Sequence, residues 1–107
     1  MAKAIENSDA IIETCNQVLS ELGDKAKPEW KETLENVVSA IETLKTKFFI
    51  KTNLAVPGTR ACLKDATEVR SLVSAGDLSK LPDGLSRLQA SLQKLLSQAK
   101  MEGIALT

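Results

Sequence analysis

The chain has 107 residues, of which 43% are hydrophobic and 26% are charged, a balance that indicates one globular domain spanning residues 1–107. Three aromatic residues and three prolines are few for a β-sandwich or barrel. No apolar run approaches the roughly 20 residues that a membrane-spanning helix needs. The absence of histidine excludes histidine-ligated metal sites, histidine phosphotransfer and the common catalytic triads.

The charges cancel overall but are unevenly distributed along the chain. Residues 1–42 contain nine acidic and four basic side chains, whereas residues 43–64 contain five basic side chains and no acidic one. The remainder holds five of each. We call residues 43–64 the basic block. Because the net charge is zero and the basic residues form no stripe along a helix, we do not expect nucleic-acid binding.

Apolar residues recur at helical spacing in four segments, which predicts helices over about 4–22, 28–51, 54–75 and 82–102. The first predicted helix has core positions Ile5, Ile12, Cys15, Leu19 and Leu22, with Ile11 and Val18 widening the stripe. Gly23 is expected to end this helix in a left-handed conformation. Ser8 falls within the apolar stripe, and we interpret it as an N-cap, the alternative being a polar residue that fixes the helix register.

The second segment has the clearest pattern, with steps of four and three throughout. Its core positions are Trp30, Leu34, Val37, Ile41, Leu44 and Phe48. Pro28 suits the first turn, where its missing N–H is not needed. The glutamates at positions 29, 32, 35 and 42 share a face that we expect to be solvated, since calcium sites draw their carboxylates from a loop. Val38 is expected to be an isolated exposed apolar residue.

The third and fourth segments complete the pattern. Their predicted core positions are Ala55, Cys62, Ala66, Val69 and Val73, then Leu81, Leu85, Leu88, Leu92, Leu95 and Ala99. A start of the third helix near Leu54 is favoured over a start at Thr59, because Pro57 is tolerated in a first turn. Gly76 is expected to end this helix, and residues 77–84 to form the turn into the next. Four helices with short connections predict an all-α fold, an antiparallel up-down-up-down four-helix bundle.

No arrangement of residues in this sequence predicts catalysis. The predicted core is apolar, the glycines do not form a phosphate-binding loop, and there is no Cys-x-x-Cys pair. We therefore expect a protein that is not an enzyme and that has no catalytic residues, metal site or cofactor. Cys15 and Cys62 are interpreted as reduced core thiols. Cys62 is the better candidate for a reactive thiol, because Arg60 and Lys64 are near it in the sequence.

The basic block is the predicted functional surface, since it combines its cations with large apolar side chains. A helix cannot bury Phe48, Phe49 and Ile50 on one face, so one of the last two is expected to point outward or lie under the loop. Arg60 and Lys64, near a helix start, oppose the macrodipole and favour an anionic partner. The predicted partner-binding residues are Lys45, Lys47, Phe49, Ile50, Lys51, Leu54, Arg60 and Lys64.

These features predict a non-catalytic interaction module that binds another protein or a second copy of itself. The alternative is peripheral binding of anionic lipid at a membrane surface, or binding of a small hydrophobic ligand by the bundle. A purely structural interpretation also stays open: Glu6 and Asp9 lie at the same end of an up-down bundle and would neutralise part of the basic block. The acids in the first residues, MAKAIENSDAIIE, are atypical of a secretory signal, so we expect a cytoplasmic protein.

Overall fold

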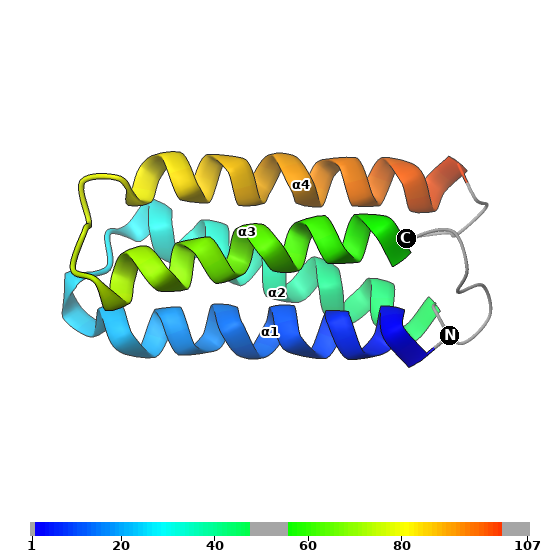
Figure 1. Ribbon diagram of the computed structural model, residues 1–107, viewed down its shortest axis with the longest axis horizontal. Coiled ribbons are helices and arrows are strands. Elements are labelled where there is room, and N and C mark those ends of the chain that lie inside the picture. Colours follow the sequence, from blue (N-terminus) through cyan, green and yellow to red (C-terminus); the bar gives the residue numbers. More distant parts are fainter. Residues whose placement is uncertain (1, 48–55, 102–107) are drawn as a thin grey trace.

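The structure, a computed structural model, describes residues 2–47 and 56–101. Within these residues four long helices lie side by side: α1 (Ala2–Leu22), α2 (Pro28–Lys47), α3 (Val56–Ser74) and α4 (Leu81–Met101) (Figure 1). A short 3-10 helix, Gly23–Lys25, follows α1. The predicted all-α four-helix bundle is confirmed. The predicted end of the second helix at residue 51 and start of the third at residue 54 lie outside the described residues.

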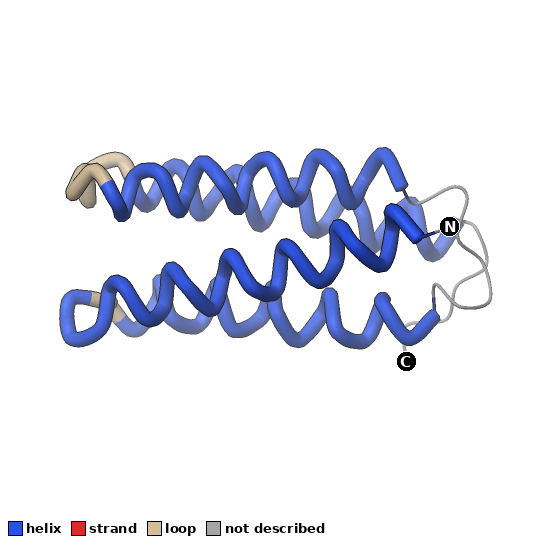
Figure 2. The backbone as a smooth tube through the Cα atoms, turned by 60° about the horizontal axis from the view of Figure 1, so that its bottom comes forward, coloured by secondary structure: helices blue, strands red, loops and turns tan. Residues whose placement is uncertain are grey.

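Successive helices alternate in direction, but they do not all pack on their neighbours in sequence. Helix α1 packs against α2 and α3, while α4 packs against α3 and α2, so that α2 and α3 occupy diagonal corners. The α1/α3 and α2/α4 pairs are therefore parallel, and the α1/α2 and α3/α4 pairs are antiparallel (Figure 1). The starts of α1 and α3 and the ends of α2 and α4 meet at one end of the bundle, which we call the α2–α3 end (Figure 2).

The helix ends at the opposite end of the bundle follow the predicted signals. Gly23 and Gly76 have φ angles of 50° and 74°, which residues with a side chain adopt only with strain. At the end of α3, the N–H of Asp77 donates to the carbonyl of Leu72 at 2.9 Å and that of Gly76 to Val73 at 3.1 Å. This pair of hydrogen bonds is a Schellman motif, which satisfies two carbonyls that the helix leaves free.

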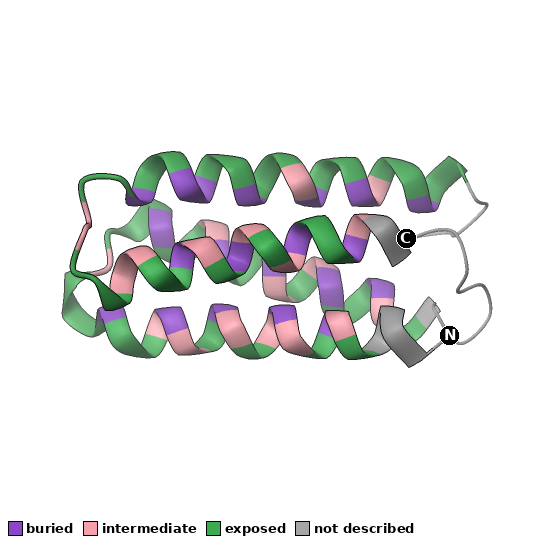
Figure 3. Cartoon of the chain, viewed as in Figure 1, coloured by how far each residue is buried: buried purple, intermediate pink, exposed green. Residues whose placement is uncertain are grey.

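One apolar core runs the length of the bundle, along the inward faces of all four helices (Figure 3). Its buried members are Ile11, Cys15, Val18, Leu22, Trp30, Leu34, Val37, Ile41, Leu44, Cys62, Ala66, Val69, Leu81, Leu85, Leu88, Leu92, Leu95 and Ala99. Every predicted core position of α4 is confirmed, as is every one of α2 up to Leu44. The predicted core positions Ile5, Phe48 and Ala55 lie outside the residues whose burial is described.

The predicted core stripe of α1 is wrong in its details. Ile11 and Val18 are fully buried, whereas Ile12 and Leu19 are only partly buried. The buried stripe of α1 passes through Ser8 and Cys15 in steps of three and four residues. Ile12 and Leu19 each follow a buried residue, so their side chains point about 100° away from the stripe, toward α2. The prediction of Ser8 as an N-cap is also wrong, since it lies inside α1 with no exposed surface.

Helices α3 and α4 approach closely where glycine faces the neighbouring helix. Helix α4 begins at Leu81, one residue before the predicted start at 82, and Gly84, which was also assigned to the preceding turn, is buried in its first turn. A Cβ atom at Gly84 would lie 3.1 Å from Cδ1 of Leu72 and 3.4 Å from Cγ2 of Val69. The missing side chain therefore allows the two helix backbones to pack closely.

Candidate interaction surfaces

Lys45 is the only lysine of the basic block on α2 whose side chain the structure describes. Its Nζ forms an ion pair with Asp9 of α1, and about a third of the lysine side chain is exposed. The expectation that Asp9 would neutralise part of the block is thus confirmed. Glu6 is exposed and forms no ion pair with any other described residue.

Arg60 and Lys64 lie in the first half of α3, one helical turn apart, and both are exposed. Neither forms an ion pair within the described part of the chain. Because α2 and α3 are diagonal, the structure does not bring Lys45 together with these two cations on adjacent helices. Lys47 is the last residue of α2, and its side chain lies outside the described residues, as do Phe49, Ile50, Lys51 and Leu54.

A small buried polar group supports the α2–α3 end from inside. Ser8 of α1 and Thr59 of α3 have no exposed surface. The side-chain amide of Asn7 donates a hydrogen bond to Oγ1 of Thr59 at 3.2 Å, which joins the two parallel helices. A polar contact at one position of an apolar interface favours a single register, and the Asn7–Thr59 hydrogen bond is such a contact. The interpretation of Ser8 itself as a register residue stays a prediction.

The two thiols are buried and are not part of a disulfide. Burial raises the pKa of Cys15 to about 12. Burial also raises the pKa of Cys62 to about 12, with smaller contributions from Cys15 and from Asp65. A nucleophilic cysteine needs a lowered pKa and access to solvent, so the alternative of a reactive Cys62 is wrong, and the prediction of two core thiols is confirmed.

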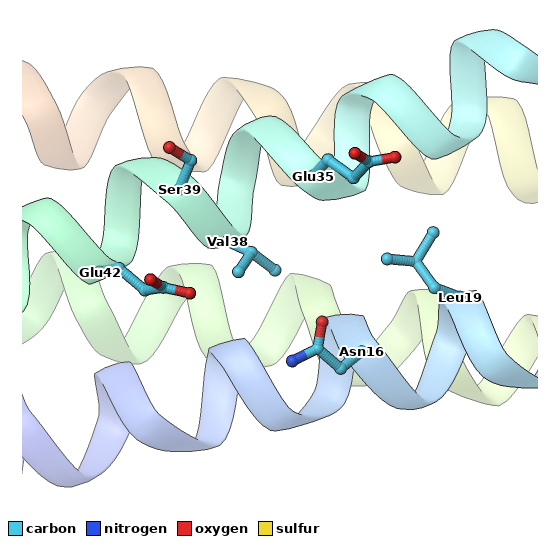
Figure 4. A pocket seen from close by; sticks show the side chains of 6 residues that line it. All are labelled: Asn16, Leu19, Glu35, Val38, Ser39 and Glu42. Atoms are coloured by element: carbon cyan, nitrogen blue, oxygen red, sulfur yellow. The ribbon is translucent and has the colours of Figure 1, made fainter.

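A groove between α1 and α2 was not predicted from the sequence. It is lined by Asn16, Leu19, Glu35, Val38, Ser39 and Glu42, and we call it the α1/α2 groove (Figure 4). Leu19 and Val38 point toward each other from the two helices, and both are partly buried against the core. Val38 is therefore not the isolated exposed residue that we expected, but part of an apolar floor between two glutamates.

A signal for this groove exists in the sequence. On α1 the apolar pairs Ile11–Ile12 and Val18–Leu19 recur seven residues apart, and on α2 Val37 is followed by Val38. One member of each pair faces the core, so the second member must lie on a flank of the helix. Doubled apolar positions at heptad spacing thus indicate a partly exposed apolar row.

The remaining described grooves lie along the α2/α4 interface, which is the least extensive of the four helix interfaces. One is lined by Asn36, Ser39, Ala40, Thr43 and Leu96, all uncharged, and the other lies near Trp30 and Leu85. Among the described residues, no group of three or more Cys, Asp or Glu side chains is arranged to hold a metal ion.

Comparisons with known proteins give no relative from which a function could be transferred: no family model, curated protein or solved structure matches the chain. None of the described helices combines the length and the apolar character needed to cross a membrane.

Proposed function

We propose that the chain is a non-catalytic, cytoplasmic interaction module, an adaptor-like bundle that binds another protein through the α2–α3 end. The observation that carries this proposal is the pair of exposed cations on α3. Arg60 and Lys64 have no carboxylate partner in the described residues, whereas Lys45 at the same end is paired with Asp9. Two exposed cations that pair with none of the described carboxylates, one turn apart on one helix, suit an acidic segment of a partner protein.

The spacing of these cations adds to the argument. Arg60 lies in the second turn of α3 and Lys64 in the third, beyond the first turn, where the helix macrodipole acts most strongly. The guanidinium of Arg60 can donate two parallel hydrogen bonds to one carboxylate, and the ammonium of Lys64 can pair with a second, one turn further along.

Reversing these two charges should abolish partner binding without unfolding the bundle, because both side chains are exposed. In affinity capture from cells that express the chain, the Arg60→Glu, Lys64→Glu variant should recover the specific partner at least about tenfold less well than the wild type. The matched control is Arg70→Glu, Lys94→Glu, which reverses two other exposed cations. Circular dichroism establishes that both variants remain helical.

Three outcomes would contradict the proposal. A partner captured equally by both variants would move the interface away from Arg60 and Lys64. A dependence of the apparent mass on protein concentration, lost only in the first variant, would make the partner a second copy of the chain. Salt-sensitive binding to vesicles of anionic lipid, with no captured protein, would favour the membrane-surface alternative.

A further inference from the structure

We propose that the α1/α2 groove is a second docking surface, and that its occupant is a basic amphipathic helix from a partner protein. The groove lies on a different face from Arg60 and Lys64 and has the opposite charge, so this inference goes beyond the proposed function. The two can also fail independently, because their test variants share no residue.

The floor of the groove offers apolar contact to an occupant. Leu19 and Val38 point into the space between α1 and α2 from the two helices (Figure 4). Ile12, two turns before Leu19 on α1, is partly buried like them. All three side chains are only partly buried, so part of their apolar surface is still in water. A helix that inserts leucine or isoleucine side chains here would remove that surface from water, which is favourable.

The α2 rim of the groove is anionic, and none of the residues that line the groove is a cation. Glu35 and Glu42 are exposed, line the groove, and form no ion pair with any residue that the structure describes. The sequence has no lysine or arginine from residue 4 to 24 or from residue 32 to 44, the stretches that form most of this face. The described cations that flank this stretch of α2 are Lys31, one turn before Glu35 and in no ion pair with a described residue, and Lys45, which is paired with Asp9.

The spacing of the two glutamates indicates a helical occupant. Glu35 and Glu42 are seven residues apart, which places them about 10.5 Å apart along the axis of α2. Lysine or arginine residues at the same spacing on a docked helix can pair with both, while the apolar residues between them meet Leu19 and Val38. An anionic lipid headgroup would be repelled.

The test uses a synthetic amphipathic helical peptide of about four turns, built only from lysine and leucine, as a probe. Amide chemical-shift mapping on the full chain should show the largest changes around Asn16, Leu19, Val38 and Ser39. A peptide with the same leucines and glutamate in place of lysine should not bind. The Glu35→Gln, Glu42→Gln variant should bind the basic peptide about fivefold more weakly than the wild type, from the loss of two exposed ion pairs.

The matched control is Glu13→Gln, Glu32→Gln, which removes two exposed carboxylates from the same helices but outside the groove. Its affinity for the peptide should change by less than about twofold. If both variants bound the basic peptide equally weakly, the effect would come from the net charge of the protein rather than from the groove, and the proposal would be overturned. So would chemical-shift changes centred on the α2/α4 interface, or equal binding of the glutamate peptide. The Arg60→Glu, Lys64→Glu variant should still bind the basic peptide. This result would show that the α1/α2 groove is a site separate from the α2–α3 end.

Discussion

Raising the pH from 7 to 10 should lower the free energy of unfolding by about 3 kcal/mol through the two core thiols alone. Burial raises the pKa of both Cys15 and Cys62 from 9.0 to about 12 in the folded chain. The unfolded chain releases these protons above pH 9, whereas the folded chain retains them until about pH 12. The contribution of the two thiols to the free energy of unfolding is therefore fully present below pH 9 and is lost progressively between pH 9 and 12.

Urea unfolding at the two pH values, with a reductant present, measures this effect. The control is the Cys15→Ala, Cys62→Ala variant, which is less stable at pH 7 because it leaves two small cavities but has no thiol to titrate. Its loss of stability between pH 7 and 10 should be smaller than that of the wild type by the same 3 kcal/mol or so. An identical loss in both proteins would show that lysines or other groups cause it, and that the thiols are accessible to water.

The substitution Leu95→Ala should destabilise the bundle by about 3–4 kcal/mol, one of the largest effects of any single truncation in this chain. Leu95 has no exposed surface, and it packs closely against α3: a Cβ atom added at Gly58 would lie 2.7 Å from its Cδ1 and 3.5 Å from its Cα. Helices packed this tightly relax little around the cavity, so most of the contact energy is lost.

The adjacent residue provides a matched comparison. Leu96 is only partly buried, and it lines the groove beside α2 rather than the closed core. The same truncation, Leu96→Ala, should cost less than about 1.5 kcal/mol, because less apolar surface returns to water and no closed cavity forms. Denaturant unfolding of the two variants gives the difference directly. Similar losses would mean that α4 is rotated relative to the structure described above.

The sequence predicted most successfully those helices whose apolar residues form a single stripe. On α4 and α2 the steps of four and three leave one choice of buried face, and the structure confirms it. On α1 the paired residues Ile11–Ile12 and Val18–Leu19 leave two choices about 100° apart, and only the positions of the neighbouring helices decide between them. The diagonal placement of α2 and α3 was not predictable for the same reason, because periodicity within one helix carries no information about which helices become neighbours.

The candidate surfaces were predicted less completely than the fold. The basic block is contiguous in sequence, but Lys45 and the pair Arg60 and Lys64 lie on diagonal helices. The neutralisation of part of the basic block by Asp9 was anticipated, because the chain reverses direction and brings the start of α1 to the end of α2, but its partner Lys45 was not named in advance. The α1/α2 groove was missed because it is lined by residues from two helices, among them Leu19 and Val38, and the pattern within one helix does not show which residues of another lie opposite.

The most direct test of the central claim, that this bundle binds a partner protein at the α2–α3 end, is photo-crosslinking in cells from single positions. A photo-reactive amino acid replaces Ala61, which is exposed beside Arg60 on α3, or, as a control, Ala90, which is exposed on α4. Both substitutions leave every charge in place. The proposal predicts one specific crosslinked protein from position 61 and none from position 90. No adduct from position 61, or the same adducts from both positions, would contradict it.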